Sequence, residues 1–205
     1  MQAQLSCNGL ACRRGDRLLV RGLSFELGAG EALHVTGANG IGKTTLIRAL
    51  AGLTTPFAGS VERVGGVGLV DERTALDPDQ PLGRALGFWQ RVDGCTSPEG
   101  ALKVLGLESL LEVPVRYLST GQRKRAALAA LLNRSVPIWL LDEPLSGLDA
   151  GAIAQVTSLI QLHVGGGGIA VIASHQALEI TGLRTLALED YAPRWAEADE
   201  AEEML

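Results

Sequence analysis

The chain has 205 residues, a formal net charge of −5 and 46% hydrophobic residues, a composition typical of a globular protein and unlike that of a disordered or collagen-like chain. Residues 189–205 carry −6, which leaves +1 for residues 1–188. A near-neutral body lacks the basic face that nucleic-acid binding needs, so we expect no nucleic-acid partner. Residues 190–205 are interpreted as an acidic, solvated tail.

In chain order, hydrophobic patterning predicts strands over residues 17–27, 31–36, 60–64, 66–70, 136–141, 169–173 and 183–189. Helices are predicted from 43 or 44 to 51, and over 82–92, 98–111, 121–133 and 152–163. Strands that alternate with helices favour an α/β core with a mainly parallel sheet and flanking helices. We expect one domain over residues 1–205, with a helical insert at about 82–118.

A glycine-rich loop lies between the strand predicted at 31–36 and the helix that follows it. Its sequence fits the phosphate-binding pattern G-x-x-x-x-G-K-[ST], in which backbone N–H groups and a helix N-terminus form an anion site. Lys43 can reach the β- and γ-phosphates, and the Thr44 hydroxyl can ligate Mg²⁺. The alternative is a helix entry that happens to be rich in glycine. The predicted nucleotide-binding residues of the loop are Gly37, Ala38, Asn39, Gly40, Ile41, Gly42, Lys43, Thr44 and Thr45.

Two acidic residues follow the apolar run 136–141. Asp142 fits the acid that holds Mg²⁺ in phosphate-loop NTPases, and Glu143 is a candidate general base for the attacking water. Successive residues at a strand end point in different directions, so the two acids can have different roles. The alternative is a strand that ends in two solvated carboxylates.

Three further segments resemble motifs of one family. Leu118-Ser-Thr-Gly-Gln122 lies at a helix start capped by Ser119, Asp142-Glu-Pro-Leu-Ser-Gly-Leu-Asp149 follows a buried strand, and Ser174-His175 ends another. Their order and spacing resemble the signature, D-loop and switch histidine of ABC ATPases over residues 9 to 188, with Thr120 where glycine is usual.

The resemblance implies the ABC type of P-loop NTPase fold, with an N-terminal antiparallel β part and a helical signature insert. It also implies ATP hydrolysis with Mg²⁺, in which Glu143, His175 and Lys43 are catalytic and Thr44 and Asp142 hold the metal. In the family, the signature helix of one subunit covers the nucleotide of the other. Ser119, Gly121 and Gln122 are therefore expected to bind the partner's ATP in a head-to-tail homodimer.

Some positions depart from the family pattern. Where an aromatic residue usually stacks on adenine, this chain has Arg14, which is either a guanidinium that stacks on the base or an ordinary surface residue. The glutamine loop reads Asp71-Glu72-Arg73, so Glu72 replaces the glutamine or the loop is rewired around Arg73 or Gln80.

The remaining candidates outside these motifs are cysteines and histidines. The three cysteines, Cys7, Cys12 and Cys95, have no metal-ligand spacing and are expected to be free thiols. His34 is expected to be packed, and His163 to be a favourable charge at a helix end.

The segments 10–17, 21–25 and 84–89 are similar to the ATPase subunits of the cytochrome c maturation system, the haem exporter. This resemblance implies a peripheral subunit at the cytoplasmic face of the bacterial inner membrane, together with membrane-spanning CcmB- and CcmC-like subunits. The composition itself gives no sign of haem. Alternatives are another small ABC importer or exporter, a soluble non-transport ABC ATPase, and a GTPase or small-molecule kinase, although the guanine-reading motif N-K-x-D is absent.

Overall fold

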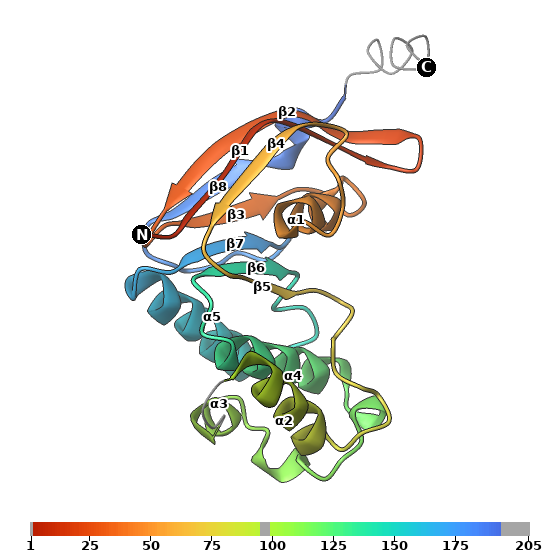
Figure 1. The fold of residues 1–205 in the computed structure, drawn as a ribbon, viewed down its shortest axis with the longest axis vertical. Coiled ribbons are helices and arrows are strands. Elements are labelled where there is room, and N and C mark those ends of the chain that lie inside the picture. Colours follow the sequence, from red (N-terminus) through yellow and green to blue (C-terminus); the bar gives the residue numbers. More distant parts are fainter. Residues whose placement is uncertain (1, 95–98, 194–205) are drawn as a thin grey trace.

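A computed structural model describes residues 2–94 and 99–193 and shows two sheets, with the helix of residues 43–51 packed between them and the other helices below them (Figure 1). Cys95 and residues 194–205 of the predicted acidic tail lie outside the described residues. In the part that is described, no helix is long and apolar enough to cross a bilayer.

The first sheet is antiparallel with strand order β2-β1-β4. Its strands are β1 (Gln4–Arg14), β2 (Arg17–Gly28) and β4 (Ala58–Val64). Strand β1 was not among the predicted strands. Register shifts between Cys7 and Leu10 and on to Arg13 interrupt its alternation of apolar residues, which is the pattern that indicates a strand. This sheet corresponds to the antiparallel β part that the family resemblance implies.

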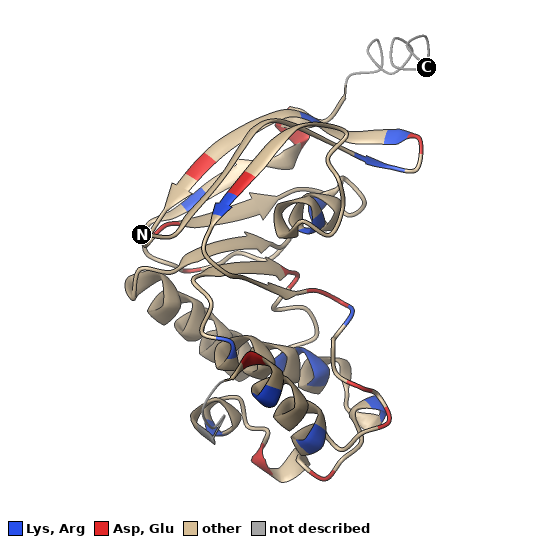
Figure 2. Ribbon diagram, in the orientation of Figure 1, with Lys and Arg blue, Asp and Glu red and all other residues tan. Residues whose placement is uncertain are grey.

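The second sheet is parallel with strand order β5-β6-β7-β3-β8. Its strands are β3 (Ala32–Thr36), β5 (Val67–Val70), β6 (Ile138–Asp142), β7 (Ile169–Ala173) and β8 (Leu183–Ala187). Strands β3, β5, β6 and β7 together contain one charged residue, which is Asp142 at the end of β6 (Figure 2). The predicted mainly parallel α/β core is confirmed.

The helices are α1 (Lys43–Ala51), α2 (Leu82–Asp93), α3 (Glu99–Val104), α4 (Thr120–Asn133) and α5 (Ala150–Gly165), with short 3₁₀ turns at η1 (Glu108–Leu110), η2 (Val115–Tyr117) and η3 (Leu188–Tyr191). The helix predicted over 98–111 is wrong beyond Val104, because Gly106 takes a positive φ of 60° that ends it. The strand predicted over 183–189 ends at Ala187 and turns into η3.

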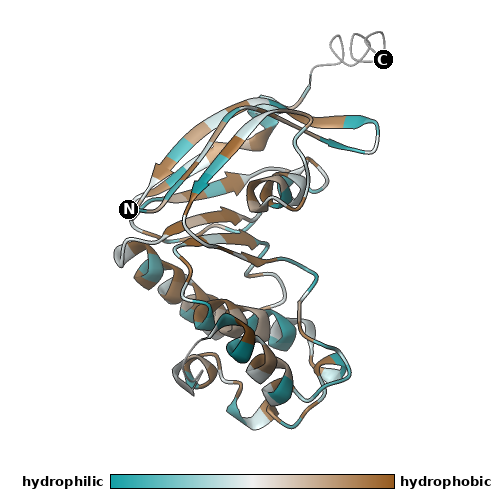
Figure 3. Cartoon of the chain, in the orientation of Figure 1, coloured by the Kyte–Doolittle hydropathy of each residue, from teal (hydrophilic) through white to brown (hydrophobic). Residues whose placement is uncertain are grey.

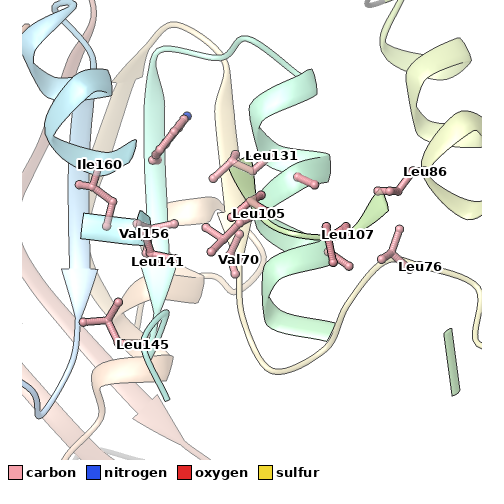
Figure 4. Packing of buried hydrophobic residues seen from close by; sticks show 14 of the residues in the cluster. Val70, Leu76, Leu86, Leu105, Leu107, Leu131, Leu141, Leu145, Val156 and Ile160 are labelled. Carbon is pink, nitrogen blue, oxygen red and sulfur yellow. The ribbon is translucent and has the colours of Figure 1, made fainter. Parts of the chain in front are cut away.

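Two apolar clusters fill the two faces of the parallel sheet. Alternate residues of β6 point to opposite faces, so Ile138 and Leu140 join the cluster beneath β1, β2 and α1, whereas Trp139 and Leu141 join the cluster under α4 and α5. Leu131 of α4 and Ile160 of α5 pack there (Figure 4). Because the inner strands of the parallel sheet are buried on both faces, they consist largely of hydrophobic residues, which are brown in Figure 3.

Parallel strands bring their carboxyl ends to one edge of the sheet. In this chain β3 ends at the glycine-rich loop, β6 at Asp142 and β7 at Ala173, just before Ser174, and these three strands are neighbours. Motifs that are far apart in the sequence therefore meet at this edge, where ligands of open α/β sheets bind.

Candidate active site

The glycine-rich loop joins β3 to α1 as predicted. Gly37, Gly40 and Gly42 have positive φ values of 147°, 82° and 122°, which L side chains rarely adopt. A Cβ on Gly42 would also lie 3.0 Å from Cβ of Leu19 on β2. The loop therefore needs glycine both for its backbone conformation and for its close contact with the antiparallel sheet.

Lys43 begins α1 and folds back over the loop. Its buried ammonium donates hydrogen bonds to the carbonyl oxygens of Gly37 (2.7 Å) and Ala38 (3.3 Å). The same nitrogen lies 3.6 Å from Oε1 of Glu143. The cation and the acid that were predicted from separate motifs thus lie together.

Glu143 also contacts the histidine of the third motif. Its Oε2 lies 2.9 Å from Nδ1 of His175, whose side chain is half-exposed. Glu143 has a positive φ of 47°, which is rare for a residue with a side chain, and its N–H donates to Ala173 O at 2.8 Å. A carboxylate held by an imidazole at the edge of an anion-binding loop has the chemistry of a base that can orient a water.

Asp142 is almost fully buried, and the Thr44 hydroxyl donates to its carboxylate. Burial raises the pKa of Asp142, and the Thr44 hydrogen bond opposes that rise. Its Oδ1 is buried without a hydrogen-bond partner among the described residues. An unpaired buried oxygen beside a threonine hydroxyl fits the protein side of a Mg²⁺ site. Phosphate and water oxygens would supply the other ligands of such an ion. Within the described ranges, no cluster of three or more His, Cys, Asp or Glu side chains could hold a metal by itself.

A hollow of about 530 Å³ lies beside Glu143 and His175. It is lined by Asn39, Asp71, Glu72, Thr74, Thr120, Arg123, Lys124, Glu143, Ser146 and His175. Glu72 thus lines this hollow, while the next residue, Arg73, lines another cavity of about 550 Å³ together with Trp89 and Leu131. The loop after β5 therefore borders both cavities: Glu72 lines one and Arg73 the other, while Asp71 and Thr74 line both.

The signature segment begins α4, and Ser119 is its N-cap as predicted. Ser119 Oγ accepts from Gln122 N–H at 3.2 Å, and Gln122 Oε1 accepts from Ser119 N–H at 2.8 Å. Gly121 leaves room for the carbonyl of Gly147, which would lie 2.7 Å from an added Cβ. Ser119, Gly121 and Gln122 do not line the hollow in front of Glu143.

The other sequence candidates have simpler surroundings. His34 is buried and its Nε2 lies 3.0 Å from Ser174 O, so the prediction of a packed histidine is confirmed. Cys7 and Cys12 are free and buried, and burial raises both pKa values to about 11. The guanidinium of Arg13 lies over the Phe57 ring, while Arg14 is exposed where β1 ends.

The prediction for His163 is wrong. Its ring stacks on Trp139 with 3.8 Å between the centroids, and burial lowers its pKa, so the neutral form is favoured instead of a charged helix end. This contact could not be predicted from local sequence, because His163 lies in α5 and Trp139 in β6.

Two contacts of the site were not predicted. Oε1 of Glu189, just after β8, accepts from the N–H of Ala38 at 2.9 Å. Lys124 of α4 is buried and donates to Asp142 O at 3.4 Å. The parallel register that pairs Thr36 with Ala187 places Glu189 beside the loop, a relationship that becomes visible only once β8 is known to pair with β3.

The family model described as ABC transporter matches residues 20–146, which include the phosphate loop, the signature and both acids. The chain belongs to the ABC transporter family. Because it carries the nucleotide-binding motifs, it is an ABC ATPase, and the predicted fold class and enzyme class are confirmed.

Among the relatives of this ABC ATPase is the "Cytochrome c biogenesis ATP-binding export protein CcmA" of Novosphingobium aromaticivorans, which is 54% identical over 92% of this chain and 97% of that protein. The protein of the same name from Zymomonas mobilis is 49% identical over 92% of this chain and 86% of its own. A solved structure described as "An inward-facing conformation of a putative metal-chelate type ABC transporter" has a TM-score of 0.75 and 27% identity, covering 92% of this chain and 80% of that one.

Proposed function

We propose that this ABC ATPase is the ATP-hydrolysing subunit of a cytochrome c biogenesis transporter that acts in haem export and release of the haem chaperone. The observation that supports this most strongly is the 54% identity to a CcmA protein over nearly the full length of both chains. We propose further that residues 1–205 act as one nucleotide-binding domain.

In the proposed site, the loop 37–45 binds the phosphates of ATP, Lys43 pairs with the β- and γ-phosphates, and Glu143 orients the attacking water while His175 holds its carboxylate. The contacts of Glu143 with Lys43 and His175 support these roles. Lys43 has to leave the carbonyls of Gly37 and Ala38 in order to reach the phosphates, which a flexible four-carbon side chain allows.

Thr44 and Asp142 are the residues that would hold Mg²⁺, supported by their mutual hydrogen bond and by the unpaired Oδ1 of Asp142. When bound, the ion neutralises charge on the β- and γ-phosphate oxygens. A divalent cation bound beside Asp142 would favour its ionised form despite burial.

The proposed active unit is a homodimer with ATP between the subunits. The N-terminus of α4 supports this proposal, because Ser119 and Thr120 are exposed and the first turn contains no acidic residue. An exposed helix N-terminus without a nearby acid attracts anions, so it can cover the γ-phosphate on a second subunit.

We propose membrane-spanning CcmB- and CcmC-like subunits as partners, which would place the chain at the cytoplasmic face of the inner membrane. The test is complementation: a bacterium that lacks its own CcmA is given this chain or its Lys43→Ala variant, and covalent haem in c-type cytochromes is measured by haem staining. Restoration by the wild-type chain alone is expected. If the chain is well expressed with its membrane subunits yet no cytochrome c forms, it serves another ABC transporter or a soluble system.

A further inference from the structure

Lys124 is a buried cation in the hollow of the candidate site, and the catalytic roles described above do not use it. It lies in the second turn of α4, after the signature segment, and reaches toward the end of β6. The next residue, Arg125, donates to Leu105 O at 2.9 Å and anchors this part of α4 to the segment that follows α3. Lys124 therefore connects α4 to the end of β6, where Asp142 and Glu143 lie.

The contact of Lys124 is with one particular peptide group. The peptide between Asp142 and Glu143 has its carbonyl on Asp142, which accepts from Nζ of Lys124 at 3.4 Å. Its N–H is on Glu143 and donates to Ala173 O at 2.8 Å. Both polar groups of this peptide are thus held, one by α4 and the other by β7.

The orientation of this peptide decides where the two acids point. Asp142 has the conformation of a strand, whereas Glu143 has the positive φ of 47° that turns its side chain toward Lys43 and His175. A residue with a side chain keeps such a backbone only where its surroundings hold it. The hydrogen bonds on the peptide provide that support.

The charges in the hollow favour a cation at this position. Four carboxylates act on Lys124, those of Asp142, Glu72, Glu143 and Asp71. Burial lowers the pKa of Lys124, and these carboxylates oppose the change by favouring the ammonium form. The carboxylates therefore offset part of the cost of burying the ammonium beside the peptide that it holds.

We propose that Lys124 is a positioning residue for ATP hydrolysis: it holds the peptide between Asp142 and Glu143, and it thereby ties the orientation of the metal-side acid and the base to α4. The proposal rests on the roles proposed above for these two acids. Movement of α4 is then transmitted to the base through one side chain.

The test compares Lys124→Met, which removes the donor and the charge, with Lys124→Arg, which keeps both. Lys103→Met on the exposed end of α3 is the matched control for the loss of a lysine. For the purified full-length chain, we expect Lys124→Met to lower kcat by about ten- to a hundredfold, because displacing a reacting group by about an ångström has an effect of that size. KM for ATP should stay within about twofold, since the phosphate loop is unchanged.

Lys124→Arg should recover most of the rate, and Lys103→Met should equal the wild type. Thermal unfolding of each variant, followed by circular dichroism, establishes that the compared proteins are folded, and Lys124→Gln replaces Lys124→Met if the latter does not fold. A kcat within twofold of wild type in the uncharged variant would overturn the proposal. A folded Lys124→Arg variant that is as slow as Lys124→Met would also overturn it. If wild-type hydrolysis is instead insensitive to Lys43→Ala, the proposed phosphate site itself fails.

Discussion

Nδ1 of His175 lies 2.9 Å from Oε2 of Glu143, although the two residues come from the ends of different strands. Because β6 and β7 are parallel neighbours in register from Ile138 to Asp142, their carboxyl ends place both side chains over the same point of the sheet. The other carboxylate oxygen faces Lys43 at 3.6 Å. Glu143 is therefore positioned by an imidazole and by the cation of the phosphate loop at the same time.

Glu143→Gln keeps the side-chain volume and removes the proton acceptor. We expect the hydrolysis rate to fall by roughly 10²–10⁴-fold, the usual loss for one positioned base. ATP should then persist between two subunits, so size-exclusion chromatography should show a monomer without nucleotide and a dimer with ATP.

Two controls accompany this experiment. ADP should not produce the dimer, because it lacks the γ-phosphate. Ser119→Arg in the Glu143→Gln background should prevent the dimer, since a bulky side chain fills the space at the N-terminus of α4. Equal dimer formation with ADP and ATP would contradict the shared-site arrangement.

Lys43→Ala removes the cation of the phosphate loop. Hydrogen bonds to charged groups contribute about 1.5–3 kcal/mol, so ATP affinity should fall about ten- to a hundredfold and hydrolysis should be abolished. Equilibrium binding of a fluorescent ATP analogue and phosphate release measure the two effects. Near-normal hydrolysis in this variant is incompatible with the assigned loop.

Glu72→Ala and Arg73→Ala form a matched pair, because the two neighbours face different cavities. We expect Glu72→Ala to bind ATP normally. Its ATPase rate in the presence of the membrane subunits should fall at least about tenfold, since the variant removes a carboxylate from the hollow beside Glu143. The measurement is ATPase activity with and without those subunits. If Glu72→Ala keeps the stimulated rate, the role of the glutamine loop belongs to Arg73 or Gln80.

His163 predicts a pH dependence of stability. Its pKa is lowered in the folded state, so below its usual value of about 6.5 the unfolded chain binds a proton that the folded chain resists. Its contribution to stability is therefore present at higher pH and is lost as the pH falls through that region. His163→Phe keeps a ring to stack on Trp139 and should make the urea midpoint less sensitive to pH between 7.5 and 5.5. An unchanged pH dependence in the variant would show that other groups cause it.

Much of the site could be predicted because its motifs are local. The glycines of the phosphate loop, the two acids after β6 and the cap at Ser119 each depend on a few consecutive residues, and hydrophobic runs located the buried strands. The contacts of Lys124, Glu189 and His163 join segments that are far apart, and they depend on strand order and register. The bulged strand β1 was missed for a related reason, because its irregular pairing hides the alternation on which strand prediction depends.

The position of β3 has a consequence for how the chain acquires its nucleotide site. Within the parallel sheet, β3 pairs only with β7 and β8, and the hydrogen bond from Ala38 to Glu189 spans 151 residues. During synthesis the phosphate loop emerges early, yet β7 and β8, the two strands that pair with β3, emerge late. Such long-range pairing is slow to form, so we expect β3 and the phosphate loop to stay partly structured until β7 and β8 have been synthesised. The first ATP that a new chain can hold firmly therefore marks the completion of its sheet.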